Sequence, residues 1–201
     1  MKYSKLACIL PIIAISACGS TPEEYGTGSE FKRVIKGKIP HTLSRVSTQT
    51  VTTGLNNTGY TYVVGRDSDN VYQAFAGLII KPALSVSPPT TGTATMTGKY
   101  SATRVYNIAT TDTVPRGVTV GNSGLTLEAD FANGTLKGGD PAKLFVNGTF
   151  NSGSLSLRGT VSYFGVDGRL LGRIGPDQAI GAFRGHDDTS VFAGGFVVSV
   201  P

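Results

Sequence analysis

Residues 136–200 read LKGGDPAKLFVNGTFNSGSLSLRGTVSYFGVDGRLLGRIGPDQAIGAFRGHDDTSVFAGGFVVSV, a series of short apolar runs separated by turns. Each run is rich in β-branched or aromatic residues and is bounded by Gly, Asn, Asp or Ser. The runs cover residues 143–150, 154–164, 169–174, 179–185 and 190–200. Runs of this length and composition are typical of antiparallel strands that follow one another along a sheet. The carboxy-terminal third therefore predicts a β-meander.

The same pattern extends upstream to about residue 60. Further strands are expected over residues 60–64, 71–80, 93–108, 118–122 and 125–131. In the last of these, apolar and polar residues alternate from Leu125 to Phe131, which predicts one face on a core and the other in solvent. Asn133-Gly134 is a hairpin signal that returns the chain to the sheet. Residues 31–58 are ambiguous between one or two edge strands and extended chain.

The composition also indicates an all-β protein. Glycine accounts for 27 of the 201 residues, charged residues for only 15%, and no segment carries a helical apolar period. Nine or ten strands in succession avoid open edges best by closing, and a barrel of about eight strands is nearly filled by its own side chains. We therefore expect a small antiparallel up-and-down β-barrel, with glycines inside strands where the sheet coils sharply.

The first residues resemble a bacterial lipoprotein signal. A positive start with Lys2 and Lys5 precedes an apolar run over residues 6–15, which is too short to span a membrane stably. Ile15-Ser16-Ala17-Cys18 matches the lipoprotein box, in which the cysteine is lipidated and becomes the new amino terminus. The alternative is an ordinary signal-peptidase site with Cys18 as a small residue beside it. The box implies a membrane anchor at Cys18, and Gly19 after it implies the outer membrane.

This interpretation divides the chain into three parts. Residues 1–17 are the signal peptide, residues 18–58 are the lipidated cysteine with a flexible tether and a weakly structured segment, and residues 59–201 are the barrel domain. Cys8 leaves with the signal, so the mature chain has no cysteine pair for a disulfide. The net charge of +5 is partly local, since five basic residues lie between positions 31 and 45. We do not expect nucleic-acid binding from so local a cluster.

The closing runs resemble a known family. Gly181-Ala-Phe-Arg-Gly185, followed by Ala193-Gly-Gly-Phe196, is similar to the last strands of the β-barrel domain of transferrin-binding protein B. That domain is shared by bacterial surface lipoproteins that include factor H binding protein and haemophilin-like carriers. The stretches 130–138 and 155–161 look like the family's preceding hairpins. The resemblance implies a surface lipoprotein that presents loops to a ligand such as a host protein, haem or an iron carrier.

Within this resemblance, a set of closing-strand residues is expected to shape the barrel. Phe183 and Phe196 would be core residues of adjacent strands, and the glycines would let the backbone coil and turn. These glycines are Gly181, Gly185, Gly194 and Gly195. The chain departs from two-lobed transferrin-binding proteins, in which each lobe has a barrel and a handle domain. It has room for one barrel, and we expect no handle and a monomer.

Candidate reactive groups are few. His186-Asp187-Asp188 is either a solvated hairpin tip, since Asp favours turns, or a metal-binding cluster, and we favour the hairpin tip. Tyrosines at positions 60, 62, 72, 100, 106 and 163 either line the core and its rim or offer exposed contact area. No serine-hydrolase elbow or glycine-rich phosphate loop occurs. We expect no enzyme, no metal and no cofactor.

Two functions follow. The first is a non-enzymatic binding module, anchored by lipid to the outer membrane at the cell surface. The second is a structural or assembly lipoprotein of the envelope that faces the periplasm.

Overall fold

The computed structural model describes residues 44–52, 59–66, 72–79, 86–108 and 115–201. Within these residues the chain forms strands and no helix, and so none of them belongs to a helix that could cross a membrane. The strands are β1 (Ser44–Thr52), β2 (Gly59–Arg66), β3 (Tyr72–Ile79), β4 (Thr93–Tyr106), β5 (Arg116–Asp130), β6 (Thr135–Asp140), β7 (Leu144–Phe150), β8 (Ser156–Tyr163), β9 (Val166–Ile174), β10 (Gln178–His186) and β11 (Ser190–Ser199).

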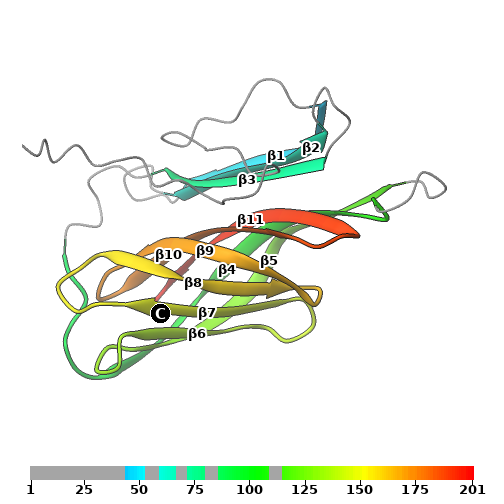
Figure 1. Ribbon diagram of the computed structural model, residues 1–201. Helices are drawn as coiled ribbons and strands as arrows, with labels where there is room; N and C mark the ends of the chain where they lie inside the picture. Colours follow the sequence, from blue (N-terminus) through cyan, green and yellow to red (C-terminus); the bar gives the residue numbers. More distant parts are fainter. Residues whose placement is uncertain (1–43, 53–58, 67–71, 80–85, 109–114) are drawn as a thin grey trace, which may run out of the picture.

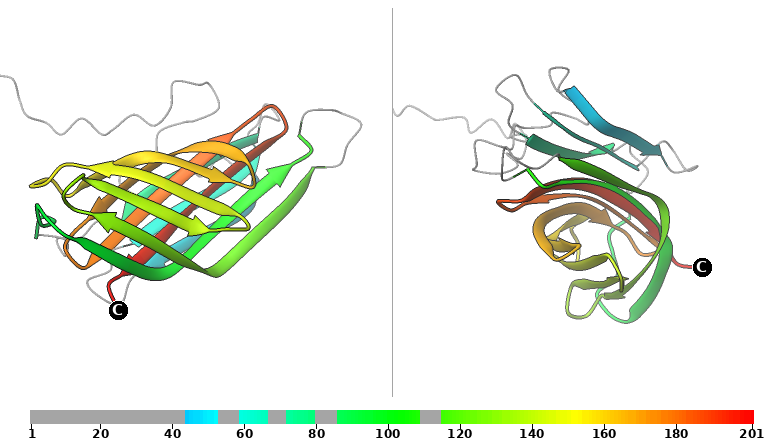
Figure 2. Two further views of the ribbon diagram at one scale, coloured as in Figure 1. Left: turned by 90° about the horizontal axis from the view of Figure 1, so that it is seen from below. Right: turned by 90° about the vertical axis from the view of Figure 1, so that its right-hand side faces the viewer.

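Strands β4 to β11 form a closed antiparallel barrel in which each strand pairs with the next along the chain (Figures 1 and 2). The last strand closes the ring on the first, with Ser190 opposite Tyr106 and Ser199 opposite Thr97. The predictions of an all-β class and of an up-and-down barrel of about eight strands are confirmed. The signal segment, the tether and Cys18 lie outside the described residues.

Side chains alternate across most of the barrel wall. In β7, Leu144, Val146 and Phe150 are buried, whereas the intervening Phe145 is 57% exposed. The inward side chains of all eight strands form one apolar cluster inside the barrel. Because a barrel of this size has little free volume, side chains rather than solvent fill it.

Aromatic residues and glycines interlock where the barrel closes. Phe196 of β11 pairs with Gly181 of β10, and Gly194 of β11 pairs with Phe183 of β10. A Cβ atom added to Gly181 would lie 2.3 Å from the Phe196 ring, and one added to Gly194 would lie 2.7 Å from Phe183. Each phenyl ring therefore occupies the space that a side chain on the facing strand would need.

A second, three-stranded sheet lies outside the barrel. Its strands are ordered β1-β2-β3, and it covers the outer surface of β10 and β11 (Figure 2). The contact is an apolar cluster separate from the barrel interior. From the sheet it includes Tyr60, Tyr62, Val64, Ala74 and Ala76, and from the barrel Val105, Ala182, Val191 and Ala193.

Two tyrosines fit this sheet closely to the barrel. The rings of Tyr60 and Tyr62 are stacked with their centroids 6.3 Å apart, and Tyr60 lies directly over Gly195 of β11. A Cβ atom on Gly195 would lie 2.2 Å from Tyr60 Cγ. The hydroxyl of Tyr60 hydrogen-bonds to Ser101, and that of Tyr62 to Thr103. The glycine thus permits an approach that any side chain would prevent.

The structure differs from the sequence analysis at residues 59–79. The strands expected there are present, but they belong to the separate sheet rather than to the barrel, which begins at Thr93. A second packing element beside the barrel was not expected. The physical reason lies in β10 and β11, which are apolar along almost their whole length and therefore need cover on both faces.

Candidate functional site

The candidate site lies at one end of the barrel, which we call the mouth. At this end the chain passes from β4 to β5, from β6 to β7, from β8 to β9 and from β10 to β11. The strand ends that define it are Tyr106, Arg116, Asp140, Leu144, Tyr163, Val166, His186 and Ser190. The remaining turns and the end of β11 lie at the opposite end of the barrel.

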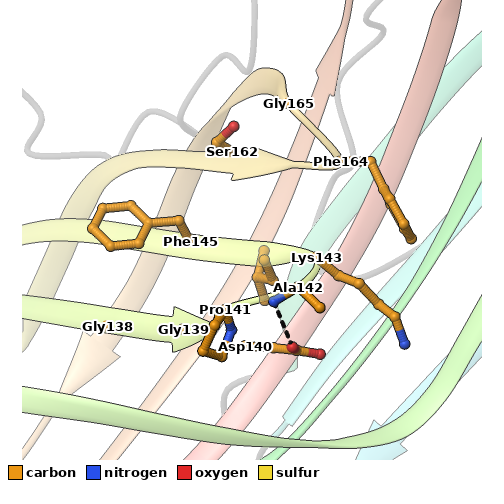
Figure 3. Close-up of a pocket in the computed structure, with 11 residues that line it drawn as sticks. Gly138, Gly139, Asp140, Pro141, Ala142, Lys143, Phe145, Ser162, Phe164 and Gly165 are labelled. Atoms are coloured by element: carbon orange, nitrogen blue, oxygen red, sulfur yellow. Dashed lines mark hydrogen bonds between the residues drawn. The ribbon is translucent and has the colours of Figure 1, made fainter.

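A hydrogen-bonded pair lies just inside the mouth. The hydroxyl of the buried Tyr100 donates to Asp140 Oδ2 at 2.8 Å, and the other oxygen of Asp140 accepts from the Ala142 N–H at 3.1 Å (Figure 3). Burial and the hydrogen bond to Asp140 raise the pKa of Tyr100 to about 12. The pair ties β4 to the β6–β7 turn and keeps that turn in place at neutral pH.

Arg104 occupies the wall of the mouth. Its Nη2 donates to Ser190 Oγ at 3.1 Å, and its guanidinium carbon lies 5.8 Å from the centre of the Tyr106 ring and 5.9 Å from that of Phe164. Both distances fit cation–π contacts. Its Nε is buried and has no hydrogen-bond acceptor among the described residues. Arg104 therefore brings a positive charge into a largely apolar setting.

A pocket of about 270 Å³ opens beside this guanidinium, lined by Arg104, Tyr106, Val118 and Phe164. Val118 faces it because of an irregularity in β5. Tyr100 pairs with Ser123 and Ala102 with Val120, so β5 contains one extra residue there, and Asn122 has a φ of 52°. Such a bulge reverses which side chains face inward beyond it. The Asn122 N–H is held by Ser101 Oγ at 3.1 Å.

Phe164 stands in an unusual backbone conformation. It forms the β8–β9 turn with Gly165, and their φ angles are 50° and 79°. Two-residue hairpin turns of this kind favour Asn-Gly, and a bulky aromatic residue at positive φ is rare. The ring is 39% exposed and packs edge-on against Tyr163, with centroids 4.8 Å apart. Strain of this kind clusters at functional sites, which makes Phe164 a candidate contact residue.

A larger, open hollow of about 670 Å³ continues from Phe164 over the outer wall. It runs across the β6–β7 turn to Phe145, and Figure 3 shows Phe145 on one side and Lys143 and Phe164 on the other. Its lining residues are Gly138, Gly139, Asp140, Pro141, Ala142, Lys143, Leu144, Phe145, Ser162, Phe164 and Gly165. Phe164 therefore belongs to both hollows.

Below Phe164, the interior is closed by aromatic packing. Tyr163 is fully buried and lies 5.4 Å from Phe192 and 6.5 Å from Phe183, measured between ring centres. Its hydroxyl has no hydrogen-bond partner among the described residues. Burial, and to a smaller extent the neighbouring Tyr100, raise the pKa of Tyr163, while Arg104 opposes that rise. The hydroxyl is therefore neutral at physiological pH.

The closing-strand residues singled out from sequence lie in the barrel wall. Gly181, Phe183 and Gly185 belong to β10, and Gly194, Gly195 and Phe196 belong to β11. They line neither hollow. Cys18 falls outside the described residues. The structure thus pairs Gly181 with Phe196 and Gly194 with Phe183 inside the barrel, whereas Gly185 packs against Phe192 and Gly195 against Tyr60.

His186-Asp187-Asp188 is placed in the β10–β11 turn at the mouth. Asp187 Oδ1 accepts hydrogen bonds from Thr189 N at 2.8 Å and Ser190 N at 2.7 Å, and also from both hydroxyls. Burial raises the pKa of Asp187, but these hydrogen bonds outweigh it and hold the pKa below its usual value. Among the described residues, no three His, Cys, Asp or Glu side chains gather as a metal site.

Sequence reasoning missed Arg104, Val118, Phe145 and Phe164. Arg104 and Val118 share a pocket through pairing and a bulge that the sequence does not reveal. Phe164 had a usable signal, because Phe164-Gly165 separates two runs at the place where Asn-Gly is usual. Of the six tyrosines considered, Tyr60, Tyr62, Tyr100 and Tyr163 are core residues and Tyr106 lies at the rim.

Comparisons with known proteins support the fold alone. No protein-family model matches the chain, and no curated protein matches its sequence. A solved surface lipoprotein is 14% identical, with a TM-score of 0.51 over 85% of this chain and 90% of that one. A mutant of transferrin-binding protein B from Actinobacillus pleuropneumoniae H49 is 16% identical, with the same TM-score and coverage.

A weaker likeness is to HpuA from Kingella denitrificans, solved in complex with human haemoglobin. It is 17% identical, with a TM-score of 0.39 over 75% of this chain and 60% of that one. The first two structures agree with the barrel and with the resemblance of the closing strands. The chain therefore has the fold of a transferrin-binding protein B-like lobe.

Proposed function

We propose that this protein is a bacterial outer-membrane lipoprotein, anchored through Cys18 and displayed at the cell surface, that binds a partner protein at its barrel mouth. The partner is a host protein, with carriers of iron or haem as the first candidates. The protein acts by binding and carries out no reaction. The acyl chains serve as a tether, because two or more chains at one terminus hold a protein stably on a membrane.

The distribution of exposed apolar side chains carries this proposal. Among the described residues, five large hydrophobic side chains are exposed, and three of them line the two hollows at the mouth: Val118, Phe145 and Phe164. Exposed apolar and aromatic side chains that gather at one place indicate an interaction surface. Phe164 strengthens the case, because it is 39% exposed and occupies a positive-φ turn position at which Asn is usual.

The lipid anchor and the surface location draw on different support. The lipoprotein box at residues 15–18 favours acylation of Cys18. One solved structure with the same fold is described as a surface lipoprotein, and another is a transferrin-binding protein. The second description is of a binding protein, in agreement with a mouth that has exposed aromatic side chains.

The location is tested by comparing two cysteine variants expressed in the bacterium that makes the protein. Cys18→Ala is expected to prevent acylation and release the protein from membranes, whereas Cys8→Ala, within the predicted signal, leaves the anchor intact. Protease treatment of intact cells is expected to digest the wild-type barrel. Protection in intact cells, with digestion after lysis, would instead favour the structural lipoprotein that faces the periplasm.

Binding is tested with immobilised full-length protein and a panel of transferrin, haemoglobin and haemin. The double variant Phe145→Ala/Phe164→Asn removes both rings while giving the β8–β9 turn its preferred Asn-Gly sequence. We expect at least a tenfold loss of affinity for the true partner. Val200→Ala is the control, because Val200 is also exposed (41%) but follows β11 at the opposite end. Equal loss in both variants would place the binding surface elsewhere.

A further inference from the structure

Among the residues that the structure describes, the charge of Arg104 has no anionic partner. Its one hydrogen bond among the described residues goes to a neutral hydroxyl, that of Ser190, and its other neighbours are the Tyr106 and Phe164 rings. Ser190 in turn contacts the carboxylate of Asp187. Asp187 Oδ1 already accepts hydrogen bonds from Thr189 and Ser190. A guanidinium has five N–H donors, and the buried Nε–H of Arg104 has no acceptor among the described residues.

The same contacts fix the orientation of Arg104. The Ser190 hydroxyl donates its hydrogen to Asp187 Oδ1 at 3.1 Å, and so it presents lone pairs to Arg104 Nη2, also at 3.1 Å. The rings of Tyr106 and Phe164 restrict the guanidinium from other directions. Preorganisation of this kind lowers the entropy cost of binding a ligand at the guanidinium.

We propose that the pocket lined by Arg104, Tyr106, Val118 and Phe164 is a socket for a carboxylate, supplied by an acidic side chain of the partner protein. Here Arg104 is the anchoring cation, and the aromatic and aliphatic walls hold the methylene groups of that side chain. The assignment rests on the proposed function, because it names the chemistry that the mouth recognises. Apart from Arg104, the described lining residues are Tyr106, Val118 and Phe164. In these largely apolar surroundings a hydrogen bond between the guanidinium and an anion is stronger than in water.

Size and charge favour a carboxylate over other anions. A pocket of about 270 Å³ accommodates the side chain of Asp or Glu and part of its backbone. A planar guanidinium matches the two oxygens of one carboxylate. A phosphate carries nearly two negative charges, and the described lining residues provide one cation to meet them.

The test uses full-length protein in detergent, with side-chain and amide NMR signals of Arg104 and Phe164 as the readout. The probes are two blocked tripeptides, acetyl-Phe-Glu-Phe-amide and its Gln counterpart, which differ only in charge and one atom type. We expect the Glu peptide to shift these signals with a dissociation constant on the order of 1–10 mM, and the Gln peptide to bind about tenfold more weakly.

Variants assign the preference to Arg104. Arg104→Gln is expected to abolish the difference between the two peptides. Arg104→Lys is expected to retain a reduced preference, because it keeps the charge and loses the fork. Phe164→Asn, which keeps the turn, is expected to weaken the binding of both peptides by a similar factor. A Glu preference that persists in Arg104→Gln would overturn the proposal, provided the variant shows wild-type amide dispersion.

Two further probes separate the alternatives. Sodium benzoate tests for a free small carboxylate, and binding of benzoate without binding of the Glu peptide would contradict a protein partner. Inorganic phosphate that competes as well as the Glu peptide would contradict selectivity for carboxylates. If the peptide binds through Arg104 while no protein of the host panel binds, the proposed function fails and the socket stands. If a protein of the host panel binds and the Glu peptide does not, the socket is overturned and the proposed function stands.

Discussion

Two walls of this barrel are built from the same kind of strand but have different outer faces. The bare wall, β5 to β8, alternates in the usual way, and the buried residues of β7 are separated by exposed ones. The covered wall, β10 and β11, is buried at nearly every position because the three-stranded sheet lies on it. Small and aliphatic residues such as Ala182, Val191 and Ala193 form most of its outer face, whereas phenylalanines and the glycines packed against them form its inner face. The difference shows how one barrel acquires a docking surface for its own chain without disturbing its interior.

The comparison also separates stability from recognition. On the covered wall, each aromatic ring is packed over a glycine or against another ring, and little of it reaches solvent. On the bare wall and at the mouth, Phe145 and Phe164 expose much of their side chains to solvent. Truncation of an aromatic residue on the covered wall should therefore lower the stability of the fold. Truncation of Phe145 or Phe164 should instead weaken binding of the partner.

The largest effect is expected from Phe196→Ala on the covered wall. The change removes a fully buried ring and uncovers the space over Gly181, so the free energy of unfolding should fall by about 3–5 kcal/mol. Denaturant unfolding followed by circular dichroism measures this change. A loss below 1 kcal/mol would mean that the closing strands are not packed as described.

A smaller effect is expected from Gly195→Ala. Its new Cβ would lie 2.2 Å from Tyr60 Cγ and 2.7 Å from the Gly181 carbonyl oxygen, so the outer sheet must move away. Overpacking of this kind costs about 1–3 kcal/mol. Limited proteolysis should show earlier cleavage within β1–β3. The matched control is Gly124→Ala in β5, where no atom lies within 4 Å of the new Cβ and stability should stay the same or rise.

Alkaline pH should weaken the covered wall through Tyr60. Burial, only partly offset by a hydrogen bond to Ser101, raises the pKa of Tyr60 to about 12. Between pH 10 and 12 the unfolded chain loses this proton while the folded chain keeps it. Stability is therefore complete below pH 10 and falls as pH rises, by up to about 1.4 kcal/mol per pH unit at this site. Tyr60→Phe should reduce the slope without abolishing it, because burial also raises the pKa values of Tyr62, Tyr100 and Tyr163. An unchanged slope would contradict the assignment.

The smallest effect is expected from Phe145→Ala on the bare wall. The side chain is 57% exposed, so the free energy of unfolding should change by less than about 0.5 kcal/mol. The same variant should weaken binding of the partner measurably. A thermal melt and a binding isotherm on one preparation test both points, and a large stability loss would show that Phe145 is part of the core.

Much of the barrel could be predicted from the sequence because its signals are local. The alternation from Leu125 to Phe131 and the Asn133-Gly134 turn each specify their own structure within a few residues. The separate sheet could not be placed, because the sequence of the strands over residues 59–79 does not indicate which strands they pair with. A signal did exist in the unbroken apolar runs 179–183 and 191–198, which indicate strands buried on both faces.

The mouth was harder to foresee because it depends on register. Arg104 lies in a strand whose polar residues mostly face solvent, and its inward orientation follows from pairing across β4, β5 and β11. The bulge that turns Val118 inward requires only one extra residue in β5, and nothing near Asn122 identifies it in advance. Sites of this kind arise from long-range pairing rather than from a motif.

The pairing of β11 with β4 has a consequence for biogenesis. Thr97 meets Ser199, so the ring is sealed by residues on the order of 100 positions apart, and this contact can form only after the final strand emerges from the ribosome. Until then the nascent protein presents two open strand edges to its surroundings, which are prone to aggregate. A chaperone that shields these edges would therefore be needed until β11 has been made and can pair with β4.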